Sequence, residues 1–281
     1  MRIAAGLKFW GALMLLALLY AYSVSHLKDA RRLKASDTLN IALPPLLQVP
    51  LAGGDRYLAA NIAVFRALVV EAEGPDPAMF RVLAQVQEGA SVLNPAHEDN
   101  YYTAQAILPW SGEVAANQLI QERAVASRPW DFLPAFFAGF NRFHFYQDPA
   151  AGARLLMEAA ERDPDNRDSL NGIAAKWYER GSDPQTAIDV IRSIQASTRS
   201  KALKQQLEKR IQRLQGLIAL REAALQYRSR NGVPPAKLDD LVAQGLLQQL
   251  PQDPMEMGYG LDASGTPILL KAKPAAGQGR Q

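Results

Sequence analysis

Apolar residues recur at helical spacing in two consecutive stretches of the chain, and the two stretches align with each other in order. The matching positions are Gly152, Leu156 and Ala159 in the first stretch and Ala187, Ile191 and Ile194 in the second. Residues three and four positions apart share one face of a helix, so each stretch predicts an amphipathic helix. The small residues on that face let a partner helix approach closely.

An Asp-Pro pair precedes each of these helices. Asp accepts hydrogen bonds from the free N–H groups at a helix start, and Pro at the next position has no N–H group that needs a partner. Asp148-Pro149 and Asp183-Pro184 therefore predict where two helices begin. An aromatic-rich helix is expected upstream of each, over residues 132–146 and 170–178. The unit is thus a pair of helices.

This helix pair repeats along the chain. The starts of the second helices are marked by Asp76-Pro77, Ser111-Gly112, Asp148-Pro149 and Asp183-Pro184. The prolines between successive pairs are Pro95, Pro129 and Pro164. Both series recur roughly every 35 residues, a period typical of stacked helical arrays. The pattern predicts about four helix pairs in residues 57–199.

Several positions in these pairs resemble the tetratricopeptide repeat (TPR) family. The matching first-helix residues are Phe136, Gly139, Phe140 and Phe143 in one copy and Leu170, Ile173, Ala174 and Trp177 in the next, with Gly181 in the turn. Gln105 departs from the pattern, because the family has a small residue there. The resemblance covers about half of the chain. It implies an all-α fold, a TPR-like α-solenoid whose first helices line a concave, partner-binding face.

A long helix is expected after the repeats, over residues 200–230. Its apolar stripe consists of Leu203, Leu207, Ile211, Leu214, Ile218 and Leu225, and its other faces are rich in Lys and Arg. We interpret it as a capping helix that covers the last repeat, because the end of a stacked array needs such a cover. The alternative is a basic amphipathic helix that binds an anionic membrane or an acidic partner.

Residues 231–271 change in character and predict a small C-terminal α+β module. A short helix is expected over 235–244, and two short strands around Tyr259 and Ile268 are expected to be joined by a turn at 262–265. The segment resembles the C-terminal part of type II secretion pseudopilins at Tyr227, Gly232, Pro235, Leu250-Pro251, Asp253-Pro254 and Tyr259. The chain has no prepilin cleavage motif, so we do not expect a pilin. Residues 272–281 are expected to be a disordered tail.

The N-terminal region reads as a membrane attachment. Residues 9–27 are continuously apolar or weakly polar, close to the roughly 20 residues that a span requires. We interpret residues 1–34 as a transmembrane signal-anchor with a basic flank, and a cleaved signal peptide is the alternative. The expected location is a single-pass protein of the inner membrane with a periplasmic body. Residues 35–56 contain several Pro and Gly residues and predict a linker.

Composition and motifs offer little support for catalysis. The net charge is +3, there is no Cys, and the three histidines lie far apart in sequence. No phosphate loop, zinc-helix motif or nucleophile elbow is present. We therefore expect no enzyme, no cofactor, no metal site and no nucleic-acid partner.

The expected functional surface is the concave face of the repeats. In the register set by Pro164, its partner-binding residues are Tyr102, Phe137, Asn141, His144, Asn171 and Tyr178. Aromatic and amide side chains suit an extended or helical peptide. The alternative is that Phe137, His144 and Tyr178 simply pack within the array. The pattern as a whole favours a membrane-anchored scaffold or adaptor at the bacterial cell envelope, in a secretion, pilus or surface-assembly context. The alternative is a structural subunit of an envelope complex, attached through its long helix and C-terminal module.

Overall fold

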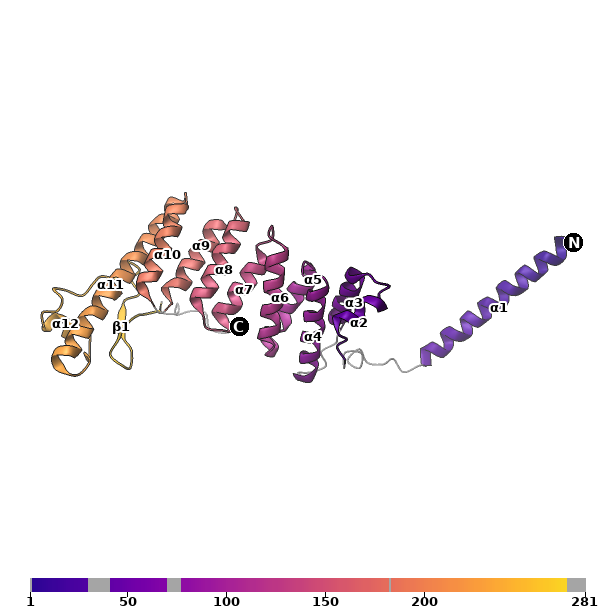
Figure 1. Ribbon diagram of the computed structural model, residues 1–281, viewed down its shortest axis with the longest axis horizontal. Coiled ribbons are helices and arrows are strands. Elements are labelled where there is room, and N and C mark those ends of the chain that lie inside the picture. The colour runs from indigo at the N-terminus through magenta and orange to yellow at the C-terminus, as the bar shows by residue number, and fades with distance from the viewer. Residues whose placement is uncertain (1, 30–40, 70–76, 182, 272–281) are drawn as a thin grey trace, which may run out of the picture.

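The chain is mostly helical. The structure, a computed structural model, describes residues 2–29, 41–69, 77–181 and 183–271 (Figure 1). Within these ranges the only sheet has two strands. The all-α class is confirmed. The expected disordered tail at 272–281 and the first part of the expected linker, through residue 40, lie outside the described residues.

The elements follow one another with short connections. The N-terminal helices are α1 (Arg2–Asp29), α2 (Pro45–Leu51), α3 (Arg56–Leu68) and α4 (Pro77–Leu93). The middle of the chain forms α5 (Glu98–Ile107), the 3-10 turn η2 (Pro109–Ser111), α6 (Val114–Ser127), α7 (Leu133–His144) and α8 (Pro149–Arg162). The rest forms α9 (Arg167–Glu179), α10 (Pro184–Ser197), α11 (Lys201–Asn231), α12 (Asp239–Ala243), β1 (Tyr259–Leu261) and β2 (Pro267–Leu269).

From α3 to α11 the helices form a row in chain order (Figure 1). Each of these helices packs mainly against neighbours in sequence, such as α7 against α8 and α8 against α9. The helix starts predicted from Asp-Pro are confirmed. The Asp148 carboxylate accepts a hydrogen bond from the backbone N–H of Ala151, and the Asp183 carboxylate accepts from the N–H groups of Gln185 and Thr186.

Close helix approach at small residues is also confirmed. A Cβ atom on Gly139 of α7 would lie 2.8 Å from the carbonyl oxygen of Gly152 on α8, and the reverse distance is also 2.8 Å. Real side chains do not fit at that distance, so only glycine at both positions permits this crossing. Leu156 and Ala159 of α8 lie in the core beside it, fully buried.

One sequence-based expectation needs correction near the N-terminus. The segment interpreted as a linker contains α2, because Pro45 fits the first turn of a helix and Val49 packs against a small cluster that includes Ala59, Ala60 and Leu93.

Helix α1 stands apart from the row in Figure 1. Its large apolar side chains between Trp10 and Tyr22 are exposed. Within the described part of the chain, no helix combines the length and apolar character needed to cross a membrane.

Helix α11 covers the end of the row, as expected, but its polar face is not all solvated. Leu203, Leu207, Ile211 and Leu214 join the core of the α7–α10 region. Leu225, expected in the apolar stripe, is instead 69% exposed, because the helix extends beyond the row there. Arg210 and Arg213, expected on the solvated basic face, are buried because both guanidinium groups pair with Glu179 of α9.

The C-terminal segment packs against the second half of α11. Leu220, Ala223 and Ala224 of α11 form a buried cluster with Leu241 of α12. The predicted hairpin is present, with β1 antiparallel to β2 and Tyr259 opposite Leu269. The Tyr259 hydroxyl donates to the backbone carbonyl of Arg213 at 3.0 Å. Gly216 lies beneath this ring, where a Cβ atom would be 2.3 Å from the hydroxyl oxygen.

Candidate functional site

Three of the six predicted partner-binding residues lie together at the surface. Tyr102 of α5 is exposed, and its ring lies 5.8 Å from that of Phe137 on α7, centroid to centroid. His144, at the end of α7, is also exposed. The spacing of Phe137, Phe140 and His144 by three and four residues keeps them on one face of α7.

Trp110 completes this surface and was not predicted. The Trp110 ring lies 5.6 Å from His144 and 5.1 Å from Phe145, and the His144 ring stacks on Phe140 at 5.2 Å. We call this set the aromatic strip; its members are Tyr102, Trp110, Phe137, Phe140, His144 and Phe145. It runs along α5, η2 and α7.

The backbone conformation of the turn η2 keeps the Trp110 side chain at the surface. Pro109 opens the turn η2, and Gly112 ends it in a left-handed conformation with φ of 90°. The chain then reverses into α6. Trp110 is left 60% exposed, although its ring touches three other rings of the strip. A large indole held in place by ring contacts and still open to solvent has a preformed shape for binding.

The other three predicted residues are buried, and their expected surface position is corrected. Asn141 has no exposed surface, because its side-chain amide exchanges hydrogen bonds with that of Gln105. Asn171 is 8% exposed on α9. Tyr178 packs in the core with 6% exposure, and this burial raises the pKa of its hydroxyl. For Tyr178 the packing alternative describes its position.

A buried amide network lies beneath the strip. Gln105 of α5 accepts from Asn117 of α6 at 2.9 Å, and Gln121 donates both to Asn117 at 3.1 Å and to the backbone carbonyl of Tyr101 at 2.8 Å. With Asn141, the network joins α5, α6 and α7. The Gln105 amide thus connects three helices, which a small residue at this position would not do. The Gln105 amide has partners at both its nitrogen and its oxygen, and a buried amide paired in this way fixes one arrangement of its neighbours. Within the described residues the Gln121 Oε1 atom has no partner.

A cluster of three side chains, which we call the charged node, lies in the first half of α5 and the loop before α7; its members are Tyr101, Arg128 and Asp131. The Tyr101 hydroxyl donates to Asp131 at 2.6 Å, and Arg128 pairs with the same oxygen at 2.9 Å. Burial and then the bond to Asp131 raise the pKa of Tyr101. Burial alone would raise the pKa of Asp131, but hydrogen bonds from Tyr101, the Leu133 N–H and Arg128 outweigh it and lower that pKa. Tyr101 therefore stays a donor and stacks on Tyr102 at 4.9 Å.

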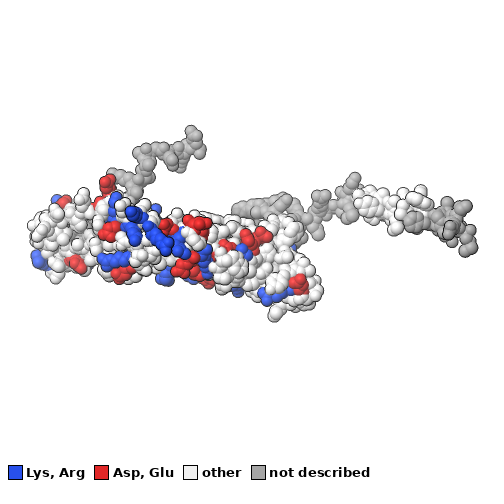
Figure 2. Space-filling view, turned by 90° about the horizontal axis from the view of Figure 1, so that it is seen from above, with Lys and Arg blue, Asp and Glu red and all other residues white. Residues whose placement is uncertain are grey.

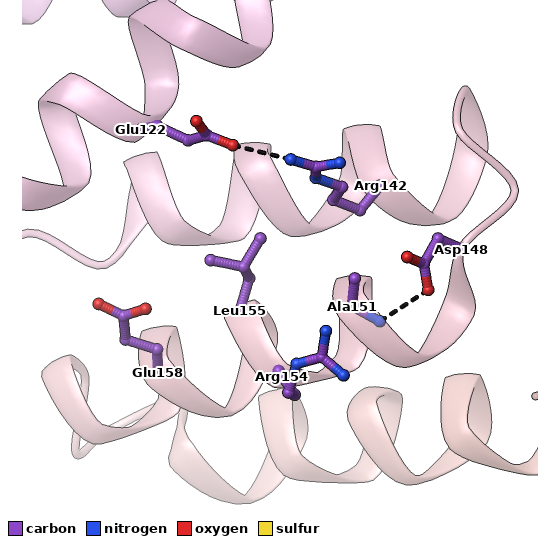
Figure 3. Close-up of a pocket in the computed structure, with 7 residues that line it drawn as sticks. All are labelled: Glu122, Arg142, Asp148, Ala151, Arg154, Leu155 and Glu158. Carbon is purple, nitrogen blue, oxygen red and sulfur yellow. Dashed lines mark hydrogen bonds and ion pairs between the residues drawn. The ribbon is translucent and has the colours of Figure 1, made fainter.

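A second surface feature is a shallow, charged hollow between α6, α7 and α8 (Figure 3). Its volume is about 510 Å³. Its charged groups already have roles within the fold, because Arg142 pairs with Glu122 at 3.0 Å and Asp148 caps α8. Arg154 and Glu158 add one charge of each sign. The hollow therefore shows no preference for ligands of one charge.

Chemistry-bearing clusters do not appear elsewhere in the residues described. Within these ranges no group of three or more His, Asp or Glu side chains could hold a metal ion. The carboxylates that a pseudopilin analogy would single out serve turns. Asp253 accepts from the N–H groups of Met255, Met257 and Gly258, and Asp262 accepts from those of Ser264 and Thr266.

Comparisons of this chain with protein-family models, with curated proteins and with solved structures found no match. The aromatic strip is therefore the candidate site on the strength of its own geometry.

Proposed function

We propose that this chain is a TPR-like α-solenoid that acts as a scaffold or adaptor and binds a protein partner along the aromatic strip. The observation that carries the proposal is the exposed Trp110, held by ring contacts beside His144 and Phe145. Aromatic anchors of this kind dominate the energetics of protein interfaces. The remaining members of the strip extend this surface along α7 to Phe137 and Tyr102.

The strip favours a partner segment with apolar or aromatic anchors. Five of its six rings, those of Tyr102, Trp110, Phe137, Phe140 and Phe145, carry no formal charge. Both signs of charge interleave on the face seen in Figure 2, so the described surface there offers no single-sign field for nucleic acid. A helix or an extended peptide that places two anchors along the strip fits this chemistry.

The proposal includes attachment to the membrane of the bacterial envelope. The exposed apolar side chains of α1 support it, and they appear as an uncharged stretch in Figure 2. The envelope and secretion or surface-assembly context comes from the resemblance of the C-terminal module alone. The full chain is expected to stay in the membrane pellet after carbonate extraction. Release into the supernatant would remove the membrane part of the proposal, and a mature N-terminus near Ser23 would indicate a cleaved signal.

A photocrosslinker placed within the strip tests partner binding directly. Ala106 is exposed on α5 between Tyr102 and Trp110, so Ala106→p-benzoylphenylalanine positions the probe beside both rings. In cells that express the full chain, we expect a discrete protein adduct from this position. The matched control is the same replacement at Ala126, which is exposed on α6 outside the strip.

The adduct must also depend on the anchors. Trp110→Ala in the probe-bearing chain should reduce the adduct about 30-fold, the effect of a lost interface anchor. Trp130→Ala is the matched control, because Trp130 is 67% exposed but lies outside the strip. An adduct that survives Trp110→Ala, or that appears equally from position 126, would contradict the proposed site.

A structural subunit of an envelope complex is the second candidate. The observation that favours it is the exposure of Leu225 and Val233 where α11 meets the C-terminal segment. Deleting that segment is not a clean test, because it would expose the buried cluster around Leu220 and Leu241. Leu225→Asp with Val233→Asp leaves the core intact. Loss of a large detergent-solubilised complex in this variant, with strip crosslinks unchanged, would favour the second candidate.

A further inference from the structure

Helix α3 presents an apolar stripe to the outside of the row. Leu58, Ile62, Phe65 and Val69 follow one another by four, three and four residues and lie on one face, and all four are exposed, Phe65 to 65%. The opposite face is small and buried against α4; its residues are Ala59, Ala60, Ala63, Val64 and Ala67. Helix α3 is therefore apolar on two sides and covered, within the described residues, on one.

Helix α2 enlarges this apolar end. It contains no charged residue, and Leu46, Leu47 and Leu51 are all more than half exposed. Tyr57 and Leu68 of α3 are exposed as well. We call the exposed apolar residues of α2 and α3, together with Val69, the N-terminal face. Monomeric soluble proteins rarely leave more than a few hundred Å² of contiguous apolar surface open.

The two ends of the row differ in how their terminal helices are covered. At the C-terminal end, α12 and the hairpin cover α11 with a buried apolar cluster and an ion-pair network. At the N-terminal end, the described residues provide no such cover for the stripe of α3. Stacked helical arrays need polar or covered terminal units to remain soluble. Helix α3 lies at the N-terminal end of the row (Figure 1), and its apolar stripe is on the face turned away from α4.

We propose that the N-terminal face docks against the same face of a second copy of this chain. Taking roughly 150 Å² for a fully open large side chain, the lower end of the range for aromatic rings, the nine exposed apolar side chains of this face present on the order of 800 Å². This equals the area, about 800 Å², that each partner buries in a standard stable interface. The dimer is independent of the partner bound at the aromatic strip.

The charges around the face favour a protein over a lipid surface as the occupant. Helices that lie on anionic membranes flank their apolar face with Lys and Arg. The two basic residues of α3 instead make contacts within the chain, because Arg56 donates to the Leu93 carbonyl at 2.7 Å and Arg66 to the Ile41 carbonyl at 3.2 Å. A row of large side chains at helical spacing suits an antiparallel helix.

A two-fold axis follows from this arrangement. When one surface patch binds its own copy, the closed solution is an isologous dimer. The middle of the stripe lies between Ile62 and Phe65, so two α3 helices cross there and Ile62 of one copy lies near Ile62 of the other. The aromatic strip remains accessible to its partners on both copies.

Single-cysteine crosslinking of the full chain tests the proposal. The chain has no cysteine, so Ile62→Cys creates its only thiol. With a short bismaleimide, we expect this variant to form a covalent dimer in cells, and two differently tagged copies to appear in one band. Gln206→Cys is the matched control, because Gln206 is exposed on α11 at the other end of the row, and this variant should remain monomeric.

A charged substitution in the N-terminal face gives a second test of the dimer. Phe65→Asp added to Ile62→Cys should reduce the covalent dimer about 10-fold or more without unfolding the chain, since Phe65 is outside the core. A monomeric Ile62→Cys chain that reacts with aqueous maleimide as fast as Gln206→Cys overturns the proposal, because the N-terminal face is then open to solvent. A monomeric Ile62→Cys chain that is protected from maleimide also overturns the proposal, because something other than a second copy then covers the face. A crosslink between Leu15→Cys and position 62 would identify α1 as that cover, and its absence would indicate lipid.

Discussion

Asn141 and Gln105 exchange two hydrogen bonds through their side-chain amides, each at 3.2 Å, in the fully buried space between α7 and α5. Gln105 also accepts from Asn117, so one amide ties three helices together. The aromatic strip lies directly above, on the exposed faces of the same α5 and α7. The relative position of Tyr102 and Phe137 therefore depends on a polar contact that a partner does not touch.

Breaking this contact should cost stability. Asn141→Ala leaves the Gln105 amide partly unpaired in a buried site, and we expect a loss of about 1–3 kcal/mol in the free energy of unfolding. The measurement is the midpoint shift in urea unfolding followed by circular dichroism. Gln206→Ala, an exposed amide on α11, is the control and should change little. An unchanged midpoint for Asn141→Ala would mean that the network is not stabilising.

The glycine crossing of α7 and α8 gives a second prediction. Gly152→Ala places a Cβ atom 2.8 Å from the Gly139 carbonyl oxygen, and α7 and α8 must separate. The expected net loss is about 1–3 kcal/mol despite the better helix propensity of Ala. Gly172→Ala is the matched control. Its Cβ atom would meet only Leu203 at 3.6 Å, an ordinary contact, so this change should be neutral or stabilising. Thermal unfolding of the two variants side by side decides the point.

The attachment of the C-terminal segment depends on Glu179. This buried carboxylate pairs with Arg210 and Arg213, and Arg213 continues to Asp253 at 3.0 Å and to the Leu270 carbonyl at 2.7 Å. Glu179→Gln leaves buried positive charge without its partner, which typically costs about 3–5 kcal/mol. We expect faster amide hydrogen exchange in α12 and the hairpin. Glu222→Gln, at an exposed position of α11, should leave that exchange unchanged.

Low pH should reduce the stability that the charged node gains from the Asp131 carboxylate. The folded-state pKa of Asp131 lies below its ordinary value of 3.8, because hydrogen bonds from Tyr101, Leu133 and Arg128 outweigh the effect of burial. A lowered folded pKa means that the ionised carboxylate stabilises the fold above the ordinary value. This stabilisation is lost as the pH falls through the folded pKa.

The test is the pH dependence of unfolding. Wild type should lose stability more steeply than Asp131→Asn between about pH 5 and pH 3, so that the difference between them shrinks on acidification. Near neutral pH the variant should be less stable by about 1–3 kcal/mol. Asp165→Asn, at an exposed position, should run parallel to wild type. Parallel curves for Asp131→Asn would contradict the assigned hydrogen bonds.

Much of the candidate site was open to prediction, and the rest was not. The repeat register set by Pro164 assigned Tyr102, Phe137 and His144 to one face, and all three belong to the aromatic strip. Asn141 follows Phe137 by four residues and shares that sequence signal, yet it is buried. Side-chain spacing tells which face of a helix a residue occupies, but not how deeply the neighbouring helices cover that face.

Local chemistry along the chain determined the helix starts, the helix pairs and the small residues at their crossings. An N-cap carboxylate, a proline without an N–H and a helical repeat of apolar residues act within a few positions, so they are visible in sequence. Contacts between distant residues were decided only by the tertiary structure. Arg213 pairs with Glu179 and Asp253, Gln105 pairs with Asn141, and the apolar stripe of α3 stays uncovered within the described chain. Each of these features depends on which helices come to lie side by side, and the burial of each residue follows from that packing.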